Sequence, residues 1–150
     1  TAALGLLVVL AVVVAVGGGG LAAGAVLAAE GRRVVGIEPS GAPTMFNALQ
    51  AGKPVALESI NSIASDSLGA GIAGKVNFEI CKEGLNRVEL VEDTHLRSSQ
   101  RWLWEHSRLV SETGAAAGLA GLSAGLLDGD PGPIGIVLCG ANVDPSVFGV

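Results

Sequence analysis

The sequence predicts an α/β fold: a three-layer arrangement in which helices flank both faces of a parallel sheet. First, the apolar runs at 6–16, 34–37 and 134–138 are short, and most are rich in β-branched residues. Second, Ala- and Gly-rich helical stretches separate these runs, and such alternation is typical of a parallel sheet buried on both faces. Third, the 150 residues are 49% hydrophobic and 15% charged, which suits one domain with a large core. We therefore expect a single α/β domain over residues 1–150.

The first half of the chain is expected to supply two strands and two helices. Val12 to Val16 is short, uncharged and β-branched, so it predicts a buried strand. A helix is expected near 20–30, and the next apolar run predicts a strand near 34–38. A second helix is expected near 42–51. The segment 52–67 is expected to pass over the edge of the sheet.

The second half predicts three helices and two strands. A helix near 68–82 is expected to end at Gly84, before a strand at 87–91. Asp93 is the expected N-cap of a helix near 94–109. Small residues dominate the helix expected at 113–127, and this predicts that the helix packs closely on a sheet or a cofactor. A final strand is expected at 134–139.

Composition and charge argue against several classes of partner. The net charge is −5 and the one basic pair is Arg32-Arg33, so we expect no nucleic-acid binding. Two cysteines form no disulfide framework and no zinc spacing, which suits a reducing, cytoplasmic location. Thr1 to Ala29 is uncharged and long enough to cross a bilayer. We nevertheless expect no membrane span, because four consecutive glycines would each weaken a helix by roughly 1 kcal/mol and no basic residue precedes them.

Four consecutive glycines, Gly17 to Gly20, lie between the first expected strand and the first expected helix. A turn without side chains brings backbone N–H groups close to an anion, and the helix N-terminus adds the positive end of its dipole. Glycine runs are also common in linkers, but linkers are not flanked by dense apolar sequence as this run is. The run therefore predicts a phosphate-binding turn.

One hypothesis for the phosphate ligand is a dinucleotide. Gly17, Gly19 and Ala22 satisfy the pattern G-x-G-x-x-A. Glu38 ends the next expected strand about twenty residues later, where an acid that binds ribose would lie. This pattern indicates an NAD- or FAD-binding Rossmann-type domain, and a non-catalytic phosphate-binding module is a further alternative.

A second hypothesis uses more of the chain. The segments VAVGGGGLAAG, VVGIEPSGAP, SDSLGAG, SETGAAAGLAGL and IVLCGAN occur in this order from Val14 to Asn142. As a set they resemble the pyridoxal-phosphate-dependent threonine/serine dehydratases, the fold type II or tryptophan-synthase-β-like enzymes. The resemblance implies a lyase of amino-acid metabolism that eliminates the β-hydroxyl of a hydroxy-amino acid as water. Hydrolysis of the resulting aminoacrylate returns that water and gives a 2-oxo acid and ammonia. It implies pyridoxal 5'-phosphate as cofactor and a small amino acid as substrate.

The resemblance also implies which residues bind the cofactor. The backbone of Gly17, Gly18, Gly19, Gly20 and Leu21 would hold the phosphate. Cys139, at the end of a central strand, would face the pyridine nitrogen; its neutral thiol makes the ring a weaker electron sink than a carboxylate would. Glu112 would lie beneath the ring, and the backbone at Ser67 would pass near it. From the residues alone, Cys139 also suits a core position, Glu112 a helix N-terminus and Ser67 an N-cap.

Two functional groups of the family have no counterpart here. Glu38 and the carbonyl of Ala42 match part of a cation site of some relatives, but Thr44 stands where the third ligand would be an acid, so we expect no metal. The Schiff-base lysine of the family lies N-terminal of the glycine turn, and Lys53, Lys75 and Lys82 lie in no similar context. We therefore expect no catalytic residue in this chain. The chain resembles the C-terminal half of a dehydratase and is expected to form a homo-oligomer or to pair with an N-terminal half.

Overall fold

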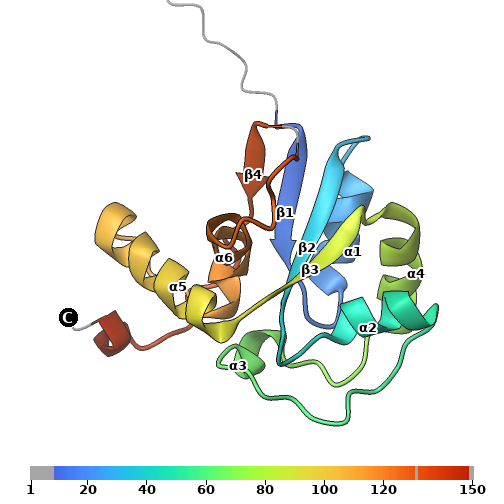
Figure 1. The fold of residues 1–150 in the computed structure, drawn as a ribbon, viewed down its shortest axis with the longest axis horizontal. Coiled ribbons are helices and arrows are strands. Elements are labelled where there is room, and N and C mark those ends of the chain that lie inside the picture. The colour runs from blue at the N-terminus through green and yellow to red at the C-terminus, as the bar shows by residue number, and fades with distance from the viewer. Residues whose placement is uncertain (1–8, 131, 149–150) are drawn as a thin grey trace, which may run out of the picture.

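A four-stranded parallel sheet forms the centre of the molecule (Figure 1). The computed structural model describes residues 9–130 and 132–148. In chain order the strands are β1 (Ala11–Ala15), β2 (Arg33–Pro39), β3 (Arg87–Val91) and β4 (Ile134–Ile136). Their spatial order is β3-β2-β1-β4, and every neighbouring pair is parallel. The predicted fold class and the positions of four strands are confirmed, although β4 ends at Ile136 and not at the predicted 139.

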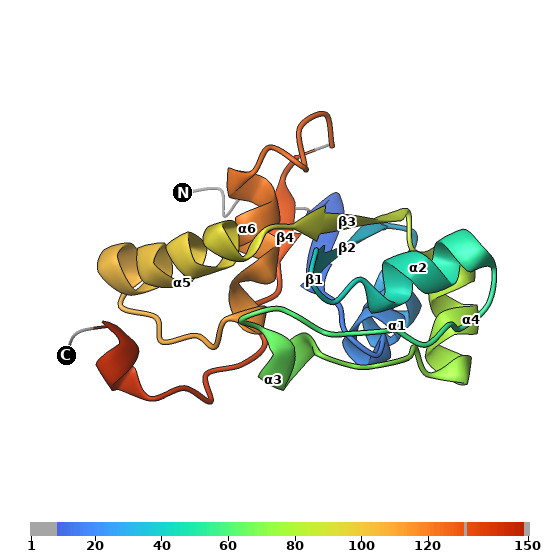
Figure 2. The ribbon, with the colours of Figure 1, turned by 60° about the horizontal axis from the view of Figure 1, so that its bottom comes forward.

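Helices cover both faces of the sheet (Figure 2). One face carries α1 (Gly20–Ala28), α2 (Thr44–Ala51) and α4 (Lys75–Gly84). The other carries α5 (Asp93–Ser107) and α6 (Ala117–Ser123), with the one-turn helix α3 (Ser65–Leu68) near the ends of the strands. Two short 3-10 helices, η1 (Gly114–Ala116) and η2 (Pro145–Phe148), complete the fold.

The alternating side chains of β1 and β2 divide the core into two layers. Val14 and Val34 pack with Met45 and Phe78 beneath α1, α2 and α4. Val13, Val35 and Ile37 pack on the opposite face with α5 and α6. Because successive strand residues point to opposite faces, two uninterrupted apolar strands build both layers.

Helix α6 lies very close to the sheet, as its small residues predict. A Cβ at Gly118 would lie 2.6 Å from a methyl group of Ile136, and one at Gly121 would lie 2.7 Å from Ile37. The helix is shorter than predicted, because 113–127 divides into η1, α6 and a turn in which Gly125 has a φ of +74°. Positive φ ends a helix, and glycine adopts it without strain.

Two other predicted boundaries are wrong. The helix expected over 68–82 begins only at Lys75, as α4, because a loop with glycines at 69, 71 and 74 precedes it; the one-turn helix α3 lies before that loop. Asp93 is the first residue of α5 and not its N-cap. Its carboxylate instead accepts hydrogen bonds from Ser62 Oγ at 2.7 Å and from the Ile63 amide at 2.9 Å. The predicted end of α4 at Gly84 is confirmed.

Candidate cofactor site

The glycine turn connects the carboxyl end of β1 to the N-terminus of α1. Gly19 is the N-cap of α1 with a φ of +89°, and no side chain caps the helix. A Cβ at Gly19 would lie 2.4 Å from Met45 Cε, and one at Gly17 would lie 2.9 Å from the Leu68 carbonyl oxygen. Both positions therefore require glycine, Gly19 for its conformation and both for the close approach of neighbouring groups.

The amides of this turn are free to bind an anion. Within residues 9–130 and 132–148, no hydrogen bond is donated by the backbone N–H groups of Gly17 to Leu21. Their position at the N-terminus of a nine-residue helix adds the positive end of the helix dipole. Free N–H groups at a helix N-terminus are the usual protein site for a phosphate.

All eight predicted cofactor-binding residues line one cavity of about 340 Å³. The glycine turn and Leu21 form one wall, and the other walls come from α3, η1 and the segment after β4. The lining residues that the sequence predicted are Gly17, Gly18, Gly19, Gly20, Leu21, Ser67, Glu112 and Cys139. Segments up to 122 residues apart in the sequence are thus brought to the carboxyl ends of the strands, where ligands bind in open α/β sheets.

Cys139 and Glu112 lie opposite the glycine turn. The Glu112 amide donates to the Gly140 carbonyl at 3.1 Å, and a Cβ at Gly140 would lie 2.2 Å from Glu112 Oε1. This contact fixes the segment of Cys139 against the start of η1. Partial desolvation and the Glu112 carboxylate raise the pKa of the Cys139 thiol, which keeps it neutral. In the described sheet Cys139 follows an edge strand, β4, and not the central strand that the resemblance implied.

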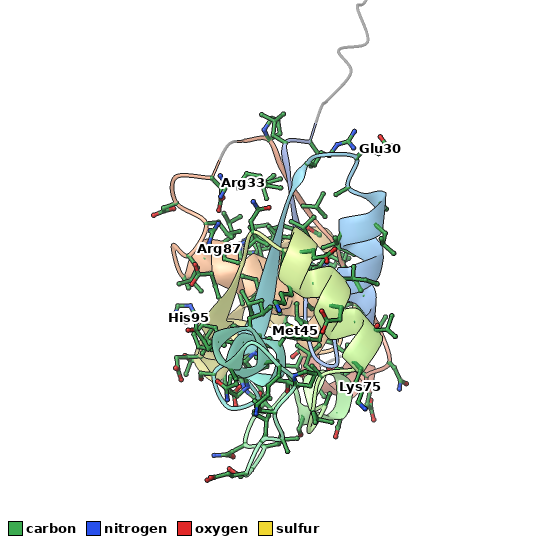
Figure 3. All side chains as sticks on the ribbon, turned by 90° about the vertical axis from the view of Figure 1, so that its right-hand side faces the viewer. Glu30, Arg33, Met45, Lys75, Arg87 and His95 are labelled. Atoms are coloured by element: carbon green, nitrogen blue, oxygen red, sulfur yellow. The ribbon has the colours of Figure 1, made fainter. Side chains whose placement is uncertain are left out.

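Ser67 and the lysines occupy places that the sequence did not define. Ser67 is the third residue of α3, so it is not an N-cap. A Cβ at Gly114 would lie 2.3 Å from the Ser67 hydroxyl, so α3 packs directly against η1. Lys53, Lys75 and Lys82 are exposed, and Lys75 lies at the surface at the start of α4 (Figure 3). None of the three is among the described residues that line the cavity.

Glu38 has a structural role that the dinucleotide hypothesis did not anticipate. Its side chain is fully buried, and its two oxygens accept hydrogen bonds from the amides of Met45 and Phe46, both at 2.8 Å. Burial raises its pKa to about 7, although these two hydrogen bonds act in the opposite direction. A carboxylate held inside the protein at the N-terminus of α2 cannot reach a ribose in the cavity. The assignment of Glu38 as a ribose-binding acid is therefore wrong.

A larger polar hollow of about 750 Å³ lies beside α2. The described residues that line it include the carboxylates of Glu58, Glu92 and Asp93 and no cationic side chain. Three carboxylates would repel a phosphate dianion. The smaller cavity at the glycine turn is therefore the better candidate for a phosphorylated ligand.

The sequence comparison assigns the fold and the site to a family. The sequence model described as "Pyridoxal-phosphate dependent enzyme" matches residues 2–140, and the chain belongs to this family. This confirms the predicted family, and with it the cofactor on which its members depend; no comparison favours the dinucleotide alternative.

The relatives of the chain include dehydratases, a deaminase and a racemase. The chain is 38% identical over 117 residues to a phenylserine dehydratase from Ralstonia pickettii, a match that covers 77% of this chain and 36% of the relative. The serine racemase of Dictyostelium discoideum superposes with a TM-score of 0.81 at 29% identity, over 91% of this chain and 45% of the other. Threonine deaminase isoform 2 of Solanum lycopersicum superposes with a TM-score of 0.83 at 29% identity, over 92% of this chain and 42% of the deaminase. The chain thus spans less than half the length of these relatives.

Proposed function

We propose that this chain forms the phosphate- and pyridine-binding part of a pyridoxal-phosphate-dependent dehydratase. The proposed enzyme acts as an ammonia-lyase on a hydroxy-amino acid such as serine, threonine or an aryl relative of serine, and releases a 2-oxo acid and ammonia. The observation that carries the proposal is the single cavity shared by the free amides of Gly17 to Leu21 with Ser67, Glu112 and Cys139. The names of the relatives supply the substrate class.

Each residue of the cavity has a distinct proposed task. The amides of the glycine turn bind the phosphate without any cationic side chain among the lining residues. When bound, the cofactor supplies an electron sink for cleavage of the Cα–H bond and departure of the β-hydroxyl. The neutral Cys139 thiol would face the pyridine nitrogen and would not hold it protonated, which suits an elimination whose leaving group takes the electrons. Glu112 supports the segment of Cys139 through its contact with Gly140.

The proposed reaction requires a Schiff-base lysine, and none of the lysines in this chain is among the described residues that line the cavity. We infer that a further part of the enzyme, in the same polypeptide or in a separate one, contributes the Schiff-base lysine and the groups that bind the substrate carboxylate. The span of less than half of each relative supports this inference, as does the exposure of Lys53, Lys75 and Lys82. Without that part, the chain is proposed to bind a phosphate ligand and perform no chemistry.

The surface of α1 supports the same inference. This helix carries no charged residue, and helices that are apolar all round are normally covered on every side. Leu21 and Leu27 are nevertheless 43% and 72% exposed. Between α1 and β4 lies an apolar hollow of about 710 Å³. We propose that the lysine-bearing part, or a second copy when the chain is alone, covers this face.

The helices of the described residues include none long and apolar enough to span a membrane.

The test uses the intact natural polypeptide that contains these residues, whose mass shows whether further segments are present. With pyridoxal phosphate we expect a yellow protein that absorbs above 400 nm and releases ammonia from serine, threonine or phenylserine. Replacing Cys139 with alanine should shift the absorbance maximum. If the polypeptide contains the lysine-bearing part, or is mixed with a separate chain that carries it, and still stays colourless with the cofactor supplied, the proposal is overturned.

A further inference from the structure

Helix α4 contacts the glycine turn from the side opposite the free amides. The Gly18 carbonyl oxygen accepts two hydrogen bonds, from Asn77 Nδ2 at 3.0 Å and from the Gly74 amide at 3.2 Å. The Gly19 carbonyl oxygen accepts from the Ala23 amide at 2.8 Å, with Cys81 Sγ 3.9 Å away. Among the described residues, Asn77 and Cys81 provide the side chains that donate to the carbonyls of Gly17 to Gly20.

These hydrogen bonds determine where one amide of the turn points. In a trans peptide the C=O of one residue and the N–H of the next point in opposite directions. Because the Gly18 carbonyl is directed at Asn77, the Gly19 N–H is directed away from α4. Gly19 lines the cavity, and its N–H donates to no group in the described part of the chain. Asn77, together with the Gly74 amide, therefore fixes the orientation of a peptide unit that forms part of the cavity wall.

The side chain of Asn77 is itself held in place. A Cβ at Gly74 would lie 2.8 Å from Asn77 Nδ2, so the missing side chain of Gly74 leaves the space that the amide occupies. The conformation of Gly19 also brings it against Met45 Cε, beside Asn77. Met45 lies on the face of the sheet covered by α2 and α4 (Figure 3). Glu38 in turn binds the Met45 amide at 2.8 Å. The turn is thus supported by α2 and α4 together, and Asn77 is the supporting residue with a strong donor.

We propose that Asn77 is a positioning residue for phosphate binding: it holds the Gly18–Gly19 peptide so that the Gly19 N–H is presented to the phosphate. The proposal rests on the proposed function, since it needs a phosphate in this cavity. Asn77 does not touch the ligand. Its loss leaves the Gly18 carbonyl with the Gly74 amide as its remaining donor, so the Gly18–Gly19 peptide is held less firmly and phosphate binding must order it further.

The test is a calorimetric titration of the intact natural polypeptide that contains these residues with two probes, pyridoxal 5'-phosphate and inorganic phosphate. Asn77→Ala is expected to weaken both affinities by the same factor, about 3- to 10-fold, the value of one neutral hydrogen bond. Asn77→Leu, which keeps the number of side-chain heavy atoms but has no donor, should give the same loss. Glu79→Gln, an exposed change on the same helix, should change neither affinity. Cys139→Ala should weaken the affinity for pyridoxal 5'-phosphate and leave that for inorganic phosphate unchanged, because inorganic phosphate has no ring.

A second readout observes the amide directly. In a proton–nitrogen correlation spectrum, phosphate should shift the Gly19 N–H signal strongly in the unmodified chain and much less in the Asn77 variants. Equal affinities for both probes in all Asn77 variants would overturn the positioning role and leave the proposed function intact. A loss confined to the cofactor would also overturn it, and unfolding of both variants would assign Asn77 to the fold and not to the site. If the unmodified chain binds neither probe, the proposed function itself fails.

Discussion

At the scale of single residues, the glycines of the turn are not equivalent. Gly19 combines positive φ with a Cβ position already filled by Met45, whereas a Cβ at Gly24, within α1, would meet nothing within 4 Å. We therefore expect Gly19→Ala to lower the free energy of unfolding by at least about 1–2 kcal/mol, the strain of a left-handed alanine. It should also weaken binding of the phosphate.

Gly24→Ala is the matched control. Alanine in the middle of a helix is more favourable than glycine, so this change should raise the free energy of unfolding by about 0.5–1 kcal/mol. Urea titrations of both variants measure the two effects. If Gly19→Ala raised the free energy of unfolding as Gly24→Ala does, the turn would not adopt the conformation described above.

Glu38 predicts a pH dependence of stability. Its pKa is about 7 in the folded chain and near 4.5 when unfolded, so the folded state binds the proton more tightly between these values. The contribution of Glu38 to stability is therefore complete below pH 4.5 and is lost as the pH rises to about 7. The loss amounts to about 3 kcal/mol.

Glu38→Gln removes this titration and keeps the size of the side chain. Between pH 4.5 and 7.5, the free energy of unfolding of Glu38→Gln should rise by about 3 kcal/mol relative to the unmodified chain. Denaturant unfolding at a series of pH values measures the difference, in which other titrating groups cancel. A difference that does not vary with pH would contradict the assignment of the buried carboxyl.

At the scale of elements, an ion pair joins the start of β3 to the segment before β4. The Asp130 side chain, 3% exposed, binds the Arg87 guanidinium through both oxygens, with Arg33 3.2 Å away. Figure 3 shows both arginines near the same end of the sheet. Hydrogen bonds and the charge of Arg87 hold the pKa of Asp130 below its usual value. The pair should therefore stabilise the fold at neutral pH and weaken as the pH falls through that lowered pKa.

Asp130→Ala should lower the free energy of unfolding at pH 7 by about 2–4 kcal/mol, because it leaves a partly buried guanidinium without its main partner. The control is Glu89→Ala, which removes the more exposed partner of Arg87, 2.7 Å away, and should have an effect of about 1 kcal/mol or less. Thermal and urea unfolding measure both. Equal losses would show that Asp130 is not the dominant partner.

Elements also show what the sequence could and could not predict. The strands β1 and β2 were predictable because both faces of each are buried and apolar. The glycine turn was predictable because its lack of side chains is visible in the sequence. The break between α3 and α4 was not, since it depends on the approach of Leu68 to Gly17, a contact between residues 51 positions apart. The roles of Asn77 and Glu38 were missed for the same reason: each depends on a backbone partner that only the folded chain supplies.

At the scale of the whole molecule, an apolar face lies between α1 and β4. We expect the chain, expressed alone, to self-associate through this face. Ala28→Glu places a charge in the hollow and should shift the chain to monomers, as measured by sedimentation velocity. Leu122→Glu, at an exposed position of α6, should not. Unchanged sedimentation of Ala28→Glu would contradict the assignment of this face as the contact surface.

A crystal structure with pyridoxal phosphate shows whether the cavity at the glycine turn binds the cofactor. We expect the phosphate about 3 Å from the amide nitrogens of Gly17 to Leu21 and the pyridine nitrogen beside Cys139 Sγ. A phosphate bound elsewhere, or a ring directed away from Cys139, would contradict this expectation.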